Sequence, residues 1–355
     1  MEVQRFQSSL ESFRRLRGWS QAELANRAQT SRAAVSAIET GRHVPSTEVA
    51  LSLARAFECK VEDLFQLGGT KQEPVWAWPP KRTPCRFFHS SVLGRTVLYP
   101  AEETFLGAPP HDGVFTGKRQ DLRSSVEPDQ TLVVAGCDAA IRLLSSELER
   151  LSGFRLLIIT RSSREALELL RQRLVHVAGV HLADPESRGG NARIVQNALG
   201  VGYCLLRHAR WQEGVALDPT LKINSVRKAL QSNLRWIGRE EGTGARRCFD
   251  RLFLESRPRK SLSSYTANSH VAVVEAIKSG WAQAGVCPRL FALEARLSFL
   301  NVEREDYDLC YPVELEGDPR LVALVKAVRS SSYRQMLGDL EGYDTESTGE
   351  IQTVS

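Results

Sequence analysis

From residue 130 onward, side chains able to bind a small molecule follow several apolar runs. Cys137 and Asp138 come directly after TLVVAG, and Ser162 and Ser163 follow FRLLIIT. Backbone N–H groups at the start of a helix, together with the helix dipole, favour an anion there. These positions predict a small-molecule site, for which a tetrahedral oxyanion such as molybdate is one candidate. The candidate ligand-binding residues are Cys137, Asp138, Ser162, Ser163, His181, Thr243, Gly244, Arg246, Ser269 and His270.

The same residues have structural interpretations that stay open. Ser162, Ser163 and Ser269 could serve only as helix N-caps. Arg246 could pair with Asp250, four residues further along a helix. Asp138 would repel a bare oxyanion and would suit an amine or a sugar hydroxyl. The ligand could then be a zwitterion or a larger organic molecule.

Enzyme and metal chemistry receive less support. His176 and His181 lie five residues apart on a predicted strand, which places them on opposite faces, so they cannot share a metal ion. No Cys pair lies near them to complete a zinc site. Cys137 could be a nucleophile or a redox sensor, but packing or ligand contact is favoured. GxSxG, P-loop and GxGxxG patterns are absent. We therefore expect no catalytic residues, no metal site and no resident cofactor.

A second chemical pattern occupies Ser20 to Pro45. Ser20 and Glu23 have the spacing of a capping box, and Ser31 is placed to cap a second helix. Val35 and Ile38 share one face of that helix, and Gly41 fits its end. These features predict a helix-turn-helix, whose second helix enters the DNA major groove.

Residues 3–67 resemble the Xre/Cro-type repressor family. The resemblance rests on Arg14, Leu16 and Gly18, the run SQAELA from Ser20, Ser31-Arg32, Val35-Ser36, Ile38-Glu39, Gly41, Pro45-Ser46, Leu53-Ala54 and Leu64-Phe65. It implies five helices and an ion pair between Arg14 and Glu39. It also implies DNA contacts, and the expected DNA-binding residues are Gln21, Ser31, Arg32, Ala33, Ser36, Ala37, Thr40 and Arg42. Arg32 is the best candidate for direct readout of a base.

Strand and helix patterns alternate from residue 130, which predicts a parallel α/β domain. The alternation restarts after Trp211, so two lobes with a cleft between them are expected. Residues 131–310 resemble the PBP-like (type 2 periplasmic-binding-protein) domain, which is found fused to helix-turn-helix regulators and to some molybdopterin-synthesis proteins. The resemblance implies a hinged fold that closes on a small ligand. The matching segments include Gly136-Cys137-Asp138, Arg161-Ser162-Ser163, VHVAGVH from Val175, REEGTGAR from Arg239, SHVAV from Ser269 and Tyr307-Asp308-Leu309.

We therefore expect a multidomain chain with an all-α N-terminal domain and an α/β two-lobed domain. The expected parts are a helix-turn-helix domain over residues 1–70, a linker with short β segments over 71–129, the PBP-like domain over 130–342 and a tail over 343–355. Helix one is expected over residues 1–19, and a hairpin is expected to turn near Leu93-Gly94.

Composition agrees with a DNA-binding regulator of modest charge. Residues 1–70 hold nine Lys+Arg and eight Asp+Glu, which favours binding as a homodimer over tight binding by a monomer. Seven cysteines without CxxC spacing, no signal-like segment and no membrane-spanning run predict a cytoplasmic protein. The expected partners are double-stranded DNA, a small-molecule effector and further copies of this chain in a homodimer or higher homo-oligomer, with no membrane partner. A cofactor-handling enzyme of molybdenum or molybdopterin metabolism with a DNA-targeting head is the alternative.

Overall fold

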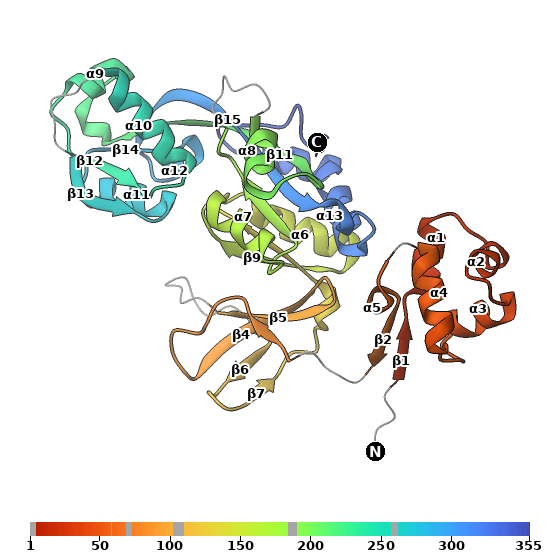
Figure 1. Ribbon diagram of the computed structural model, residues 1–355. Helices are drawn as coiled ribbons and strands as arrows, with labels where there is room; N and C mark the ends of the chain where they lie inside the picture. The colour runs from red at the N-terminus through yellow and green to blue at the C-terminus, as the bar shows by residue number, and fades with distance from the viewer. Residues whose placement is uncertain (1–4, 58, 69–72, 102–109, 184–189, 257–261) are drawn as a thin grey trace. The chain divides into compact units, whose positions relative to one another are not determined.

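The computed structural model describes residues 5–57, 59–68, 73–101, 110–183, 190–256 and 262–355 (Figure 1). The chain divides into two compact units, Met1–Pro74 and Val75–Ser355. No helix in these ranges is both long and apolar enough to cross a membrane.

The first unit is a five-helix bundle with a short two-stranded sheet. Its helices pack around a core that includes Leu24, Val35 and Ile38. Residues 5–8 form a strand rather than the start of helix one, because they pair antiparallel with residues 65–68. The elements are β1 (Arg5–Ser8), α1 (Leu10–Leu16), α2 (Gln21–Arg27), α3 (Arg32–Glu39), α4 (Thr47–Phe57), α5 (Val61–Leu64) and β2 (Phe65–Gly68).

The segment expected to be a linker with short β segments contributes, in its described residues, a five-stranded sheet to the second unit. Its hairpin turns at Leu93 and Gly94, both at positive φ, which confirms the predicted turn. Tyr99 anchors the sheet, because its hydroxyl donates to the carbonyl of Leu174, 2.6 Å away. In spatial order the strands are β3 (Val75–Trp76), β5 (Arg95–Pro100), β4 (Cys85–Val92), β6 (Gly113–Phe115) and β7 (Gln120–Leu122).

The rest of the second unit consists of two α/β lobes, as the alternating pattern predicted. In lobe 1, β8 pairs in parallel with both β9 and β10. In lobe 2, β12 pairs in parallel with both β13 and β14. Lobe 1 contains β8 (Thr131–Gly136), α6 (Ile141–Ser152), β9 (Arg155–Thr160), α7 (Ser163–Arg171), β10 (Val177–Val180) and α8 (Gly190–Leu199). Lobe 2 contains α9 (Val226–Gln231), β12 (Trp236–Arg239), α10 (Gly244–Ser256), β13 (Leu262–Ala267), α11 (His270–Lys278), β14 (Ala284–Pro288) and α12 (Arg289–Glu294).

Two long antiparallel strands, β11 (Tyr203–Leu217) and β15 (Ser298–Pro312), run through both lobes (Figure 1). β15 pairs with β10 of lobe 1, and β11 pairs with β14 of lobe 2. The register of β11 against β15 shifts between Arg207 and Ala209 and between Glu213 and Gly214. Bulges of this kind bend a strand, so the two long strands bend at these positions.

The chain returns to lobe 1 after β15. α13 (Pro319–Arg329) and α14 (Ser331–Gly338) pack with α6 on one face of the sheet. The segment expected to be a C-terminal tail contains β16 (Tyr343–Asp344) and β17 (Ile351–Val354), which both pair with β11. The last residues are therefore part of the central sheet. Short 3₁₀ helices cover Pro128–Gln130, Pro219–Leu221 and Val313–Leu315.

The Tyr307 side chain of β15 packs against two glycines, one at the end of β8 and one in β10. A Cβ added at Gly136 or at Gly179 would overlap the Tyr307 hydroxyl. With both side chains absent, the hydroxyl reaches the backbone of Cys137, whose N–H donates to it over 3.3 Å. The two glycines thus allow β15 to position the loop that follows β8.

Candidate functional site

The predicted recognition helix, α3, presents its expected face to solvent. Ser31 caps the helix by accepting from the N–H of Ala34, 3.0 Å away. Arg32 and Ala33 are exposed, whereas Ser36 and Ala37 are half-buried. Beyond the helix, Thr40 and Arg42 are exposed, and the Thr40 hydroxyl donates to the carbonyl of Ser36.

An ion pair joins the first helix to α3, as the family resemblance implied. Arg14 donates to both carboxylate oxygens of Glu39, from Nε at 2.6 Å and from Nη2 at 3.0 Å. The Gln21 amide also donates to Glu39, over 2.9 Å. Gln21 thus lies beside the recognition helix with its amide nitrogen already bonded. The predicted capping box is only half formed, because Ser20 caps α2 while Glu23 pairs with Arg27.

In the second unit, a cavity of about 1420 Å³ lies between the lobes and is bordered by the small sheet. Seven of the ten predicted ligand-binding residues line it, and they come from both lobes. Ser163, Gly244 and Arg246 do not. The seven are Cys137, Asp138, Ser162, His181, Thr243, Ser269 and His270.

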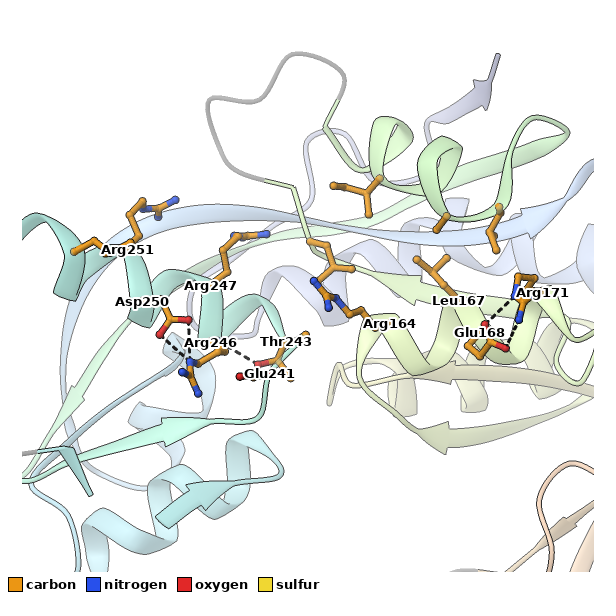
Figure 2. A pocket seen from close by; sticks show the side chains of 16 residues that line it. Arg164, Leu167, Glu168, Arg171, Glu241, Thr243, Arg246, Arg247, Asp250 and Arg251 are labelled. Atoms are coloured by element: carbon orange, nitrogen blue, oxygen red, sulfur yellow. Dashed lines mark hydrogen bonds and ion pairs between the residues drawn. The ribbon is translucent and has the colours of Figure 1, made fainter. Parts of the chain in front are cut away.

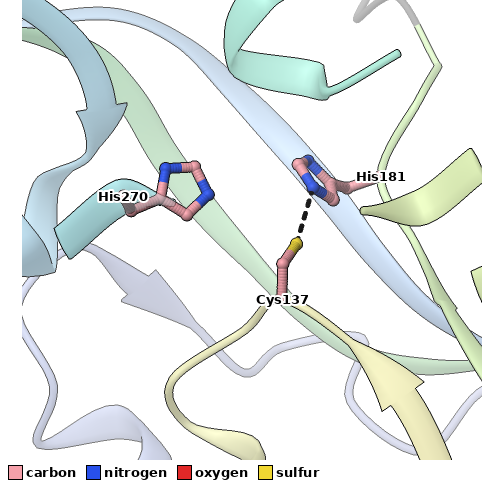
Figure 3. Close-up of side chains that lie close together, drawn as sticks. All are labelled: Cys137, His181 and His270. Atoms are coloured by element: carbon pink, nitrogen blue, oxygen red, sulfur yellow. Dashed lines mark hydrogen bonds between the residues drawn. The ribbon is translucent and has the colours of Figure 1, made fainter. Parts of the chain in front are cut away.

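Three of these residues lie close together in the cavity lining (Figure 3). Cys137 follows β8, His181 follows β10, and His270 is the first residue of α11. Cys137 Sγ lies 3.1 Å from His181 Nε2, and His181 Nδ1 lies 2.9 Å from Glu305 Oε2. The ligand-type atoms of Cys137, His181 and His270 all lie within 4.8 Å of one another.

The two histidines have opposite electrostatic surroundings. Burial disfavours a charged His181, but Cys137 and Glu305 outweigh burial and raise its pKa well above the usual value. Burial lowers the pKa of His270 well below the usual value, and Arg239 and His181 lower it further. His270 is therefore neutral near pH 7, and both of its ring nitrogens are buried without a hydrogen-bond partner among the described residues.

His176 and His181 do point apart, as predicted. His176 Nδ1 accepts from the N–H of Val133, and its Nε2 faces the carbonyl of Ser91. The expectation of no metal site rested on these two histidines and on the lack of a nearby Cys pair. The fold also brings His270 of the other lobe close to Cys137 and His181.

Asp138 lines the cavity, and its carboxylate belongs to a buried hydrogen-bond network. Its carboxylate accepts from the N–H of Ala140, pairs with His208 Nε2 at 2.7 Å and is bonded by the Tyr343 hydroxyl. His208 Nδ1 lies 3.3 Å from the Tyr333 hydroxyl. Asp138 therefore links β8, β11 and the C-terminal segment, and its oxygens are occupied.

The serines act mainly as structural caps. Ser162 forms a complete capping box with Glu165, and Ser269 accepts from the N–H of Ala272. Ser163 is buried, and its hydroxyl accepts from the N–H of His181. All three hydroxyls thus have intramolecular partners, and Ser163 helps to place the His181 backbone.

Arg246 lines a second pocket of about 700 Å³, between α7 and α8 of lobe 1 and α10 of lobe 2 (Figure 2). Arg246 Nε pairs with Asp250 at 2.8 Å, which is the structural interpretation left open for it. Thr243 lines both pockets. Gly244 packs against His181, since a Cβ there would come within 2.5 Å of His181 Nδ1.

Three residues near the cluster were not predicted. Glu305 holds His181, Arg239 lines the cavity, and Glu213 is buried with no hydrogen-bond partner for its carboxyl among the described residues. Burial, and then the charge of Glu305, raises the pKa of Glu213 well above the usual value. A signal existed in β15, where Glu303, Glu305 and Tyr307 alternate on the buried face.

The fold and the cleft define a class: a helix-turn-helix domain joined to a two-lobed, ligand-binding α/β domain. A family model described as "PBP superfamily domain" matches residues 145–329, more than half of the chain, and the chain belongs to this family. A helix-turn-helix model matches residues 10–64.

Relatives include YvgK of Bacillus subtilis (strain 168), an uncharacterized protein. It is 27% identical over 234 residues, which are 63% of this chain and 75% of that protein. YgzD of the same organism, an uncharacterized HTH-type transcriptional regulator, is 44% identical over 50 residues, which are 14% of this chain and 76% of that protein.

Among solved structures, PhnD1 of Prochlorococcus marinus (MIT 9301) is 16% identical with a TM-score of 0.44. The match covers 61% of this chain and 92% of that chain. The tungstate ABC transporter structure from Geobacter sulfurreducens is 14% identical with a TM-score of 0.45, and the match covers 59% and 98%. At these scores the likenesses carry no argument about the ligand.

Proposed function

We propose that this chain is a transcription regulator in which a small effector, bound between the lobes, modulates operator binding by a homodimer. The main support is that one chain combines the predicted recognition helix, α3, whose Arg32 and Ala33 are exposed, with a cavity of about 1420 Å³ that is lined by residues of both lobes. The bundle with only one net positive charge favours two half-sites over one.

Ligand control requires two arrangements with different affinity for the effector. β11 and β15 cross between the lobes and carry two register shifts. An effector that contacts both lobes prefers the closed arrangement. In the dimer, this closure would change the spacing or orientation of the two DNA-binding heads.

An oxyanion such as molybdate remains a candidate effector. Arg239 lines the cavity, is only 3% exposed, and has no hydrogen-bond partner at Nε among the described residues. Asp138 should repel an anion less than its charge suggests, because its carboxylate is bonded to His208 and Tyr343. A carboxylate-bearing organic molecule would satisfy the same guanidinium.

The DNA-binding surface is tested by Arg32→Ala, using a duplex selected from a random library by the purified protein. Loss of a base contact worth about 1–3 kcal/mol should weaken specific binding about 5- to 150-fold. Arg55→Ala is the matched control, because it removes one exposed positive charge from α4. Equal losses for the two variants, or no loss for Arg32→Ala, would sink the assignment.

The effector is sought by fluorescence and melting temperature against molybdate, tungstate, sulfate and small zwitterions. Trp211 is a suitable reporter, since its ring centroid lies 5.1 Å from that of His181. A saturable shift that is lost in Arg239→Gln supports an anionic effector. A shift that persists in Arg239→Gln places the effector elsewhere in the cavity.

A cofactor-handling enzyme of molybdenum or molybdopterin metabolism remains the second candidate. One observation favours it: Cys137, His181 and Glu305 follow one another at hydrogen-bond distances, as a nucleophile, a base and an orienting carboxylate do. Turnover of a molybdopterin precursor, abolished in Cys137→Ser, would establish this candidate over the regulator.

A further inference from the structure

Three side chains of types that bind metals lie close together in the cavity, and they come from both lobes. Cys137 and His181 belong to lobe 1, and His270 opens α11 of lobe 2. Figure 3 shows the side chains of Cys137, His181 and His270 pointing toward one another. The three residues are separated by 44 residues or more in sequence, so the fold alone brings them together.

His270 is the member that packing does not explain. Its side chain is buried, and neither ring nitrogen has a hydrogen-bond partner among the described residues. Burying a polar group without a partner costs about 1–3 kcal/mol. A bound group that accepts the lone pair of a ring nitrogen would remove this cost.

His181 is already oriented as a metal ligand would be. Glu305 accepts from His181 Nδ1 at 2.9 Å, which directs Nε2 toward the sulfur of Cys137. Metal-bound histidines commonly donate their second N–H to a carboxylate, which fixes the ring and its tautomer. Glu305 is itself held by Arg247 and by the indole N–H of Trp211.

We propose that Cys137 Sγ, His181 Nε2 and a ring nitrogen of His270 bind a divalent transition-metal ion of the zinc class. One thiolate, two imidazoles and an open fourth position form a donor set that suits zinc. All three donors line the same cavity as Arg239, so a ligand bound in that cavity could take the fourth position. A role for this ion as the effector rests on the proposed function, whereas the metal site itself does not.

The origin of the three donors links the ion to the arrangement of the lobes. The donor atoms lie within 4.8 Å of one another, which is close to the separation of about 3.3–3.6 Å between donors on a tetrahedral zinc ion. Because Cys137 and His181 come from lobe 1 and His270 from lobe 2, an ion bound by all three holds the lobes together. The ion therefore binds the closed arrangement more tightly than the open one.

A nucleophilic Cys–His pair is the competing explanation of the cluster. It accounts for Cys137, His181 and Glu305, but it gives no role to His270 and leaves its nitrogens without partners. The metal site gives a role to all four residues, so we prefer it to the nucleophilic pair as the explanation of the cluster.

The test uses full-length protein stripped with a chelator and titrated with Co²⁺ as a spectroscopic stand-in for zinc. We expect one ion per chain, a thiolate-to-cobalt charge-transfer band in the near ultraviolet, intense tetrahedral visible bands, and displacement of both by zinc. Cys137→Ser should abolish the charge-transfer band. His270→Ala should weaken binding by more than the about 10- to 100-fold expected for Glu305→Gln, which removes only the orienting carboxylate.

Cys85→Ser and His111→Gln are the matched controls. Cys85 lines the same cavity but donates to its neighbour's carbonyl, and His111 lies outside the cluster. Both should bind cobalt as the wild type does, and the circular dichroism of every variant is compared to verify folding. Absence of the charge-transfer band in the wild type, or its survival in Cys137→Ser, overturns the site.

Operator affinity is measured in the same samples. This measurement tests the role of the ion as an effector separately from the existence of the metal site. The expected result is a zinc-dependent change in operator affinity that is absent in His270→Ala. Cobalt binding with unchanged operator affinity would overturn the effector role and leave the metal site standing. Conversely, if cobalt does not bind but an organic effector changes operator affinity, the metal site is wrong and the regulator proposal stands.

Discussion

At the scale of single residues, His176 shows how a buried side chain can carry a pH response. Its Nδ1 accepts from the N–H of Val133 at 3.0 Å, so the ring proton lies on Nε2 and is donated to the carbonyl of Ser91. A second proton on Nδ1 would face the Val133 N–H. Burial, and then Arg320, lowers the pKa of His176 to about 4, although Asp318 and Asp129 oppose this.

His176 should therefore make the second unit less stable in acid. Its pKa is lower in the folded state than the usual value near 6.5, so the unfolded chain binds the extra proton more readily. The stability that neutral His176 contributes is fully present above about pH 6.5. It is lost as the pH falls through 4, and the whole loss amounts to about 3 kcal/mol of unfolding free energy. In urea unfolding from pH 7.5 to 4, the stability difference between wild type and His176→Gln should shrink by that order. A difference independent of pH would contradict it.

At the scale of elements, the Arg14–Glu39 pair couples α1 to α3. The side chains of Arg14 and Glu39 are 12% and 3% exposed, so removing one leaves the other charge buried without its partner. Glu39→Ala should cost about 3–5 kcal/mol. The double variant with Arg14→Ala should cost clearly less than the sum of the two single variants, because it leaves no orphan charge.

Residues 1–74 contain a core made only of their own side chains, so they suit this measurement as a separate polypeptide. Urea unfolding followed by helical circular dichroism gives the coupling energy. The exposed Glu23–Arg27 pair on α2, 43% and 51% exposed, is the matched control and should couple by less than about 1 kcal/mol. Equal coupling in the two pairs would show that burial does not govern the first.

Local signals were enough to predict many elements but not the cluster in the cleft. Ser31, Ser162 and Ser269 cap helices, and such caps depend on residues only three positions away. The meeting of Cys137, His181, His270 and Glu305 depends on contacts between lobes, which no local spacing encodes. Charged residues such as Glu213 and Glu305 also interrupt the apolar patterns of β11 and β15, so neither long strand was predicted.

The segment before β8 was predicted only in part, as a linker with short β segments, for a related reason. Its described strands, within residues 75–101 and 110–122, are separated by many turn residues, which is typical of a linker. What makes them a sheet is tertiary: Arg155 of β9 donates to both oxygens of Asp112, and Tyr99 bonds to Leu174. The β1 strand was likewise missed because its partner, β2, is about 60 residues away.

At the scale of the whole molecule, the two units divide the proposed function. The first unit presents α3, and the second contains the cleft and the crossing strands β11 and β15. A single bundle with one net positive charge gains little from phosphate contacts, because that term grows with the number of phosphates neutralised. Specific binding should therefore require two copies of α3 on one duplex.

The geometry of the operator tests this requirement. Two recognition helices of a dimer reach half-sites one helical turn apart, about 34 Å or 10–10.5 base pairs. Inserting five base pairs between the half-sites turns one of them to the opposite face, so affinity should fall to that of a duplex with a single half-site. Sedimentation should give two chains per intact operator. The same insertion outside the half-sites is the control and should change nothing. One chain per duplex, with affinity unaffected by the central insertion, would show that the protein binds its operator as a monomer.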